Sequence, residues 1–157
     1  MPSLTFRSAK PEDAVSCIRI RGLTRENAFS EEQLRELGIT AESWGAGIED
    51  ASYPGFVACI DGEMIGYCFG DRDSGEIVVL ALLPAYEGRG IGKALLAMMV
   101  THLQKQGFQR LFLACASDPR VRSYGFYRHL GWKSTGDFDE LGDEVLELIC
   151  EPMEYRP

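Results

Sequence analysis

The first part of the chain changes from alternating to helical spacing of its apolar residues. Leu4 to Ser8 alternates apolar and polar side chains, which predicts a short edge strand. Pro11 then stands near a helix start, with Glu12 and Asp13 where the positive end of the helix dipole favours acids. Apolar residues at helical spacing continue to about Leu23, so we expect a helix that ends near that residue.

A second helical region follows, and glycines interrupt it. Ser30 and Gln33 fit a capping box, in which the two side chains bind backbone amides of the first helical turn. This pattern predicts a helix directly after Ser30, and the apolar spacing predicts another near Trp44. Three glycines in residues 24–54 lower the intrinsic helix propensity of this region.

From Phe56 onward the apolar period becomes two. Residues 56–60 and 64–69 flank Asp61-Gly62, a dipeptide that supplies the positive φ angles of a two-residue turn, and together they predict a hairpin. A turn at residues 71–75 leads to residues 76–83, which are apolar on both faces. Such a segment is typical of a central strand.

The rest of the chain predicts two more helices and three more strands. In order they are a helix to about Gln106, a central strand from Arg110 to Ala116, a helix from near Pro119 to Leu130, and a hairpin of residues 132–136 and 145–149. Gly107 and Gly131 stand where glycine commonly ends a helix. The order of elements predicts a mixed α/β layer built on one sheet, with residues 1–157 forming one domain.

Composition narrows the class of protein. A chain of 157 residues with 45% hydrophobic residues suits one domain with a sizeable core. Its longest apolar run is far shorter than a membrane span, and its N-terminus lacks the pattern of a signal peptide, so we expect a cytoplasmic protein without a membrane partner. The five cysteines show no metal-ligand spacing, which favours buried thiols over metal or disulfide sites.

The net charge of the chain and the distribution of its acids indicate which kinds of partner it can bind. A formal net charge of −8 argues against nucleic acid, because phosphate contacts need a basic face. The acids cluster at residues 26–50 and again at residues 137–147. These clusters predict a site that attracts a cationic substrate, and ordinary solvated faces are the alternative.

A glycine-rich loop carries the first candidate chemistry. Gly88, Gly90 and Gly92 lead directly into an apolar helical pattern, which places unpaired amides and the positive end of a helix dipole at this point. Such an end binds phosphate or pyrophosphate. A Walker loop is excluded because Ala94 replaces the Ser or Thr that it requires, and a dinucleotide fingerprint is excluded because its last glycine is missing.

Two segments together carry a resemblance to a known family. Residues 87–92, EGRGIG, resemble the acyl-CoA loop of the GNAT superfamily of N-acetyltransferases, with Glu87 where that family usually has Arg or Gln. Residues 126–132, FYRHLGW, resemble the family's FYxxLGF block. The order of predicted elements resembles the GNAT fold across nearly the whole chain. The resemblance therefore implies an α/β (α+β) fold with a mixed, mostly antiparallel sheet flanked by helices, and central strands splayed around the acyl-CoA site.

The resemblance also implies an activity and a set of site residues. The activity is transfer of an acetyl group from acetyl-CoA to a primary amine of a small molecule or peptide, by direct attack in a ternary complex and without a metal. A CoA-binding regulatory module without turnover is the alternative, and a homodimer remains open. The implied cofactor contacts are the strand Leu80, Ala81 and Leu82, the loop Glu87, Gly88, Arg89, Gly90, Ile91, Gly92 and Lys93, and Arg120 and Tyr127.

The catalytic assignments follow from the chemistry of acyl transfer. A backbone amide of the strand at residues 80–82 is expected to stabilise the oxyanion. Tyr127, with an ordinary pKa of about 10, is expected to protonate the departing thiolate. Glu76 is either the general base or an ordinary exposed acid, and Tyr67 either lies near the substrate or packs in the core. Arg122 and Arg128 are further candidates for the CoA phosphates.

Overall fold

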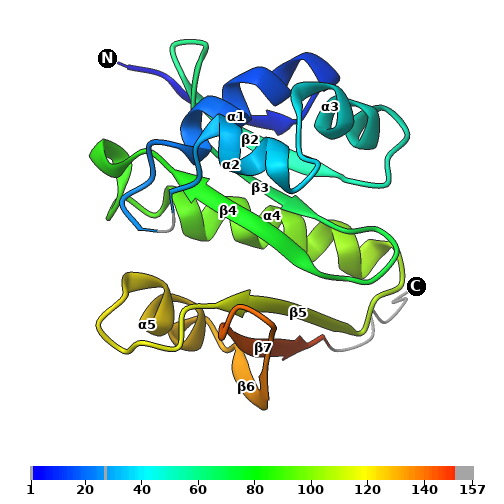
Figure 1. Ribbon diagram of the computed structural model, residues 1–157, viewed down its shortest axis with the longest axis vertical. Helices are drawn as coiled ribbons and strands as arrows, with labels where there is room; N and C mark the ends of the chain where they lie inside the picture. Colours follow the sequence, from blue (N-terminus) through cyan, green and yellow to red (C-terminus); the bar gives the residue numbers. More distant parts are fainter. Residues whose placement is uncertain (1, 27, 151–157) are drawn as a thin grey trace, which may run out of the picture.

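The computed structural model describes residues 2–26 and 28–150, and its strands form two antiparallel sheets that lie side by side (Figure 1). One sheet has the strand order β1-β2-β3-β4 and the other has the order β5-β7-β6. The strands are β1 (Leu4–Ser8), β2 (Gly55–Ile60), β3 (Glu63–Gly70), β4 (Ile77–Leu82), β5 (Arg110–Cys115), β6 (Lys133–Phe138) and β7 (Glu144–Ile149).

Five α-helices and two short 3₁₀ helices complete the described chain. They are η1 (Pro11–Asp13), α1 (Ala14–Arg21), α2 (Glu31–Glu36), α3 (Ala41–Glu49), η2 (Pro84–Tyr86), α4 (Ile91–Lys105) and α5 (Arg122–His129). The longest, α4, has 15 residues. No helix within residues 2–26 and 28–150 is long and apolar enough to cross a membrane. The mixed, mostly antiparallel α+β architecture expected from the sequence is confirmed.

The two sheets meet where β4 begins. Within the described residues, a single parallel bridge between Glu76 and Phe112 joins them, and beyond it β4 and β5 diverge. The prediction of one continuous sheet was therefore wrong, whereas the expectation of splayed central strands is confirmed. The final hairpin contributes to the separation of the two sheets. Its strand β7 pairs with the edge of β5 that faces away from β4, so the edge of β5 that faces β4 stays open.

The larger sheet carries a hydrophobic core on each face. Ile65 and Cys68 of β3 pack on the side of α4, which contributes Leu95 and Met99. Tyr67, which alternates with them, packs on the other side among residues of α1 and α3. Its hydroxyl donates to the Cys17 carbonyl at 3.0 Å, so Tyr67 belongs to the core. All five cysteines are buried free thiols, as the sequence predicts.

Local signals placed several element boundaries correctly. Asp61 and Gly62 have φ angles of 51° and 84° and form the predicted turn between β2 and β3. Ser30 accepts from the Gln33 amide, and the Gln33 side chain accepts from the Ser30 amide, which confirms the capping box of α2.

The start of α5 differs from its prediction. Asp118 accepts a hydrogen bond from the backbone amide of Arg120 at 2.9 Å, and its carbonyl accepts from Val121. These bonds hold a turn where the sequence favoured helix from near Pro119, so α5 begins only at Arg122.

Candidate active site

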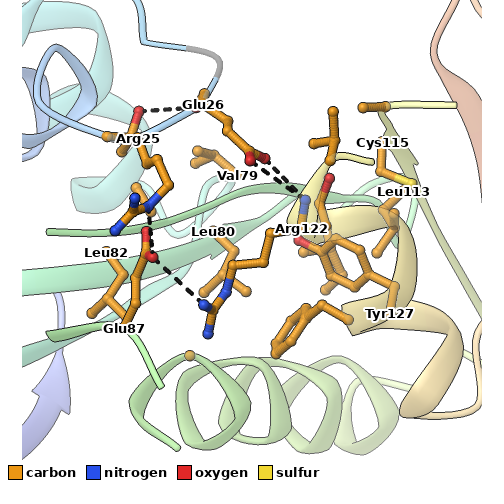
Figure 2. A pocket seen from close by; sticks show the side chains of 18 of the residues that line it. Arg25, Glu26, Val79, Leu80, Leu82, Glu87, Leu113, Cys115, Arg122 and Tyr127 are labelled. Atoms are coloured by element: carbon orange, nitrogen blue, oxygen red, sulfur yellow. Dashed lines mark hydrogen bonds and ion pairs between the residues drawn. The ribbon is translucent and has the colours of Figure 1, made fainter. Parts of the chain in front are cut away.

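A cleft of about 270 Å³ lies between the diverging strands, and side chains from five segments surround it (Figure 2). Its walls come from β4, from the loop and first turn of α4, from the end of β5, from α5, and from the loop that follows α1. The lining residues are Arg21, Thr24, Arg25, Glu26, Ile77–Leu82, Glu87, Gly88, Gly90–Lys93, Leu113–Ala116, Val121–Ser123, Phe126 and Tyr127.

The glycine loop gives the cleft an end that suits an anion. Gly88 and Gly90 have φ angles of 78° and 80°, and a Cβ atom at either would meet no other atom within 4 Å, so the backbone borders open space. Gly90 caps α4 without a side chain, and the first helical bond runs from the Ala94 amide to the Gly90 carbonyl. The amides of residues 91–93 therefore have no partner within the helix and, with the helix dipole, attract negative charge.

A carboxylate lies beside this end of the cleft. Glu87 accepts from Nε of Arg25 at 3.0 Å, and the same oxygen lies 3.6 Å from the guanidinium of Arg122. Its side chain is 15% exposed, whereas that of Arg25 is 57% exposed. Arg89 stacks instead on the ring of Tyr86, with 5.4 Å between guanidinium carbon and ring centroid, and does not line the cleft.

The loop after α1 crosses from one side of the cleft to the other. Arg25 binds Glu87 before α4, and the carboxylate of Glu26 accepts from the backbone amide of Arg122 at the start of α5, at 3.2 Å (Figure 2). These contacts join residues 62 and 96 positions apart. Sequence reasoning missed both contacts because no local motif marks a pairing over such a distance.

Tyr127 lies on α5, across the cleft from Glu87 (Figure 2). It is 9% exposed, and its ring packs edge-to-face with Phe126 and Trp132 at centroid distances of 5.0 and 6.2 Å. Burial disfavours the phenolate and raises the pKa of Tyr127 well above its ordinary value. The hydroxyl therefore keeps its proton at neutral pH.

The open edge of β4 forms one wall of the cleft. Leu80 and Leu82 pair with β3 through Cys68 and Gly66 on the other edge. On the side of β5, the described residues supply a bridge only at Glu76, before the strand begins. Backbone groups from residue 77 onward therefore face the cleft without a strand partner, an arrangement that pairs with extended ligands.

Besides Arg89, two predicted site residues, Glu76 and Arg120, lie outside the lining. Glu76 stands at the closed end, where the sheets still touch, and its pKa is raised by burial and by the nearby Asp71 and Asp139. Arg120 has a side chain that is 90% exposed and bound to Asp118 at 2.9 Å. Arg122 and Arg128 were the other candidates for contacts with the CoA phosphates. Arg122 lines the cleft, whereas Arg128 pairs with Glu144.

Within residues 2–26 and 28–150 no group of three or more His, Cys, Asp or Glu side chains is arranged to hold a metal ion.

The predicted loop and the predicted strand lie on the same cavity. The cleft is lined by Ile91, Gly92 and Lys93 of the loop and by Leu80, Ala81 and Leu82 of the strand.

Comparison with known proteins agrees with this geometry. The family model described as Acetyltransferase (GNAT) family matches residues 16–132, which include the splayed strands, the glycine loop and Tyr127. The chain belongs to the GNAT acetyltransferase family. Its glycine loop has Glu87 at the first position of the motif, and this carboxylate pairs with Arg25 and Arg122.

Named acetyltransferases similar to this chain are found among curated proteins and solved structures. The chain is 31% identical over 143 residues to a mycothiol acetyltransferase of Actinosynnema mirum and 27% identical over 144 residues to that of Saccharomonospora viridis, each alignment covering 83% of the chain. These alignments cover 44% and 45% of the relatives, so the chain spans less than half of their length.

Among solved structures, the PaiA N-acetyltransferase of Thermoplasma acidophilum in complex with coenzyme A has a TM-score of 0.76 and 21% sequence identity. That comparison covers 94% of the chain and 99% of its counterpart and shows the shared GNAT fold.

A second cavity, of about 470 Å³, lies where α1, α2 and α3 cover β4. It shares Arg21, Val78 and Val79 with the cleft, so the two cavities meet along β4. The remaining lining residues are Phe29, Leu34, Leu37, Ile39, Ser43, Trp44, Gly47, Ser52 and Tyr53. The acidic clusters of the sequence contribute only Glu26 to the described lining of either cavity.

Proposed function

We propose that this chain transfers the acetyl group of acetyl-CoA to a primary amine of a small molecule or peptide, by direct attack in a ternary complex. The observation that carries the proposal is a single cleft that combines a helix N-terminus without a side-chain cap, an unpaired strand edge and Tyr127. Membership of the GNAT family supports acetyl-CoA as the donor.

The cofactor is proposed to lie along the cleft. Its pyrophosphate binds the amides of residues 88–93 and the side chain of Lys93, and its pantetheine amides pair with the open edge of β4 at residues 80–82. Arg25 and Arg122 then exchange the Glu87 carboxylate for phosphate oxygens. The side chains of Arg89 and Arg120 take no part, because neither lines the cleft.

The acetyl transfer uses the amine in its neutral form. Its nitrogen attacks the thioester carbonyl, and a backbone amide of β4 stabilises the negative oxygen of the tetrahedral intermediate. The carbon–sulfur bond breaks, the thiolate takes the proton of the Tyr127 hydroxyl, and the new amide loses its extra proton to solvent, which reprotonates Tyr127. The products are the N-acetylated amine and free CoA. Glu76 lines neither cavity, so the ammonium proton is assigned to solvent before attack.

The acceptor is not taken over from the curated relatives. Their name gives mycothiol acetyltransferase, and the chain spans less than half of their length.

A thiol-release assay tests the proposed function against a CoA-binding module without turnover. The protein is incubated with acetyl-CoA and a panel of primary amines, and free CoA thiol is followed against the rate without amine. We expect release that depends on the amine. A thermal shift on adding CoA, combined with no amine-dependent release from a panel that includes amino acids, polyamines and peptides, would favour the regulatory module.

A further inference from the structure

The second cavity lies next to the strand along which the pantetheine arm is proposed to bind. Val78 and Val79 line both this cavity and the cleft, and residues 80–82 follow them directly. With about 470 Å³, the cavity falls in the size range of small-molecule sites. An acceptor with its amine beside Val79 can therefore extend the rest of its structure into the second cavity while the cleft holds the cofactor.

The walls of the second cavity are largely apolar and are held in place by the core. The Trp44 ring lies edge-on to Phe69 at a centroid distance of 5.3 Å, and the Tyr53 ring is stacked on Phe69 at 4.8 Å. Leu34 of α2 is buried, and it adds an aliphatic wall together with Ile39. Rings fixed by core neighbours form a preformed surface, so an apolar or aromatic group binds there without a large ordering cost.

The polar side chains of the second cavity offer little to a second ammonium group. The described lining contains no carboxylate, and its charged side chain, Arg21, already has partners within the protein, among them the Phe29 ring at 4.7 Å. The Ser43 hydroxyl bonds to the Gly38 carbonyl at 3.0 Å and accepts from the Thr40 amide at 2.9 Å. An ammonium group placed here would lose its water without gaining a charged partner, which is unfavourable.

These walls favour an acceptor with one cationic end and one apolar end. Its amine lies in the cleft beside β4, and its apolar group extends among Trp44, Tyr53 and Leu34. Burial of that group is favourable in proportion to the apolar area that leaves water. We propose that the acceptor is a primary amine that carries an apolar or aromatic group close to the amine and no second ammonium group. A small monoamine and a peptide with a large apolar first residue both offer this chemistry.

This inference rests on the proposed function, and direct binding separates the two. CoA-saturated protein is titrated calorimetrically with two matched pairs of amines, phenethylamine with ethanolamine and L-phenylalaninamide with glycinamide, and with spermidine. The members of a pair each have one primary amine, and only one of them has a phenyl ring. Thiol release from acetyl-CoA is followed with the same compounds.

We expect the apolar member of at least one pair to bind about tenfold or more tightly than its partner and than spermidine, and to give the faster thiol release. A preference in the phenethylamine pair alone would identify a small monoamine as the acceptor. A preference in the amide pair alone would identify the N-terminal residue of a peptide. Either preference supports the proposal.

A substitution at the rim assigns the preference to the second cavity. Leu37 lines this cavity and is 65% exposed, so Leu37→Gln should fold like the wild type while it replaces an apolar wall with a polar amide. The ratio of the affinities within the preferred pair should fall about threefold or more. Both members of a pair carry the same charge, so this ratio reports the contact with the apolar group.

Leu141→Gln is the matched control for that substitution. Leu141 is 82% exposed between β6 and β7, and it lines neither cavity. The same exchange at this position should leave the ratio of affinities unchanged.

Each outcome of this experiment has a definite meaning. Preferential binding of the apolar amines without thiol release supports the acceptor site and contradicts acetyl transfer. Thiol release with spermidine, ethanolamine and glycinamide at rates equal to those with the apolar amines supports transfer and overturns the acceptor proposal. Absence of binding by both apolar amines, or an unchanged ratio in folded Leu37→Gln, also overturns it.

Discussion

Glu87 places a negative charge next to the proposed pyrophosphate site, and two arginines pair with it. We predict that Glu87→Gln leaves CoA affinity equal or raises it by up to about fivefold. The change releases Arg25 and Arg122 for phosphate oxygens, and ion pairs whose arginines are exposed to solvent are worth about 1 kcal/mol or less. Calorimetric titration with CoA measures this.

Glu31→Gln is the control for that experiment. It removes the same charge from an exposed pair with Arg35 on α2, away from the cleft, and should leave CoA affinity unchanged. A marked loss of affinity in Glu87→Gln alone would mean that the carboxylate holds the loop in its binding conformation.

Tyr127 is the residue on which the proposed acid step depends. Tyr127→Phe keeps the ring contacts with Phe126 and Trp132 and removes only the hydroxyl, so CoA affinity should persist while kcat falls about 10²- to 10⁴-fold. Steady-state kinetics with saturating acetyl-CoA measure the fall. Wild-type turnover by the variant, where chemistry limits the rate, would leave Tyr127 as a core aromatic only.

The pH profile of the wild type provides a second readout for the same residue. Because burial raises the pKa of Tyr127 above its ordinary value of about 10, ionisation of the phenol should not reduce kcat up to about pH 10. Activity should rise with pH as the acceptor amine loses its proton. A descending limb with a midpoint near pH 8 would contradict the assignment.

At the scale of elements, the junction of β1 with η1 depends on one carboxylate. Asp13 accepts from both terminal nitrogens of Arg7 at 2.7 and 2.9 Å and from the Lys10 amide at 2.7 Å. Burial alone would raise the pKa of Asp13, and these hydrogen bonds outweigh it and lower the pKa. Because Arg7 is 39% exposed, solvent screens part of the attraction.

We predict that Asp13→Asn lowers the free energy of unfolding by about 1–2 kcal/mol at pH 7. The native-state pKa is the lower one, so the carboxylate stabilises the fold fully above the unfolded pKa of about 3.9 and loses this effect as the pH falls through the native pKa. Urea unfolding at pH 7 and pH 3 should show the difference between variant and wild type shrinking at low pH.

Asp73→Asn is the control for the stability measurement. Its carboxylate is 78% exposed and lies 3.7 Å from Arg72, so its loss should change stability little at either pH. If Asp13→Asn changes the free energy of unfolding as little as Asp73→Asn does, solvent screens the Asp13–Arg7 pair as fully as the exposed Asp73–Arg72 pair.

Elements fixed by local chemistry could be predicted from the sequence, and pairings between distant segments could not. The Asp61-Gly62 turn and the Ser30 capping box follow from the conformations and hydrogen bonds of neighbouring residues. The placement of β7 between β5 and β6, which leaves two sheets in place of one, depends on strands up to about 40 residues apart. No short window of sequence specifies such a pairing.

At the scale of the whole molecule, the cleft combines segments from both halves of the chain. The sequence located the glycine loop and Tyr127 because each has a recognisable motif, and both line the cleft. The sequence did not show which of Arg120 and Arg122 lines the cleft. In the structure Asp118 binds Arg120, and Arg122 lines the cleft. The contact of Arg25 with Glu87 depends on where the loop after α1 runs in the folded chain, which local sequence does not show.

The central claim is that CoA binds in this cleft against the amides of the glycine loop, and Gly90→Asp tests it. The side chain would enter open space at a left-handed position and set a negative charge against the pyrophosphate. Gly62→Asp is a close match, with φ of 84° in place of 80° and equally open surroundings, in the turn between β2 and β3.

Calorimetric titration of acetyl-CoA into the wild type and both variants is the deciding measurement. The account predicts affinity lowered at least tenfold, about 1.4 kcal/mol, in Gly90→Asp and unchanged in Gly62→Asp. A folded Gly90→Asp protein that binds acetyl-CoA as tightly as the wild type would contradict the proposed site.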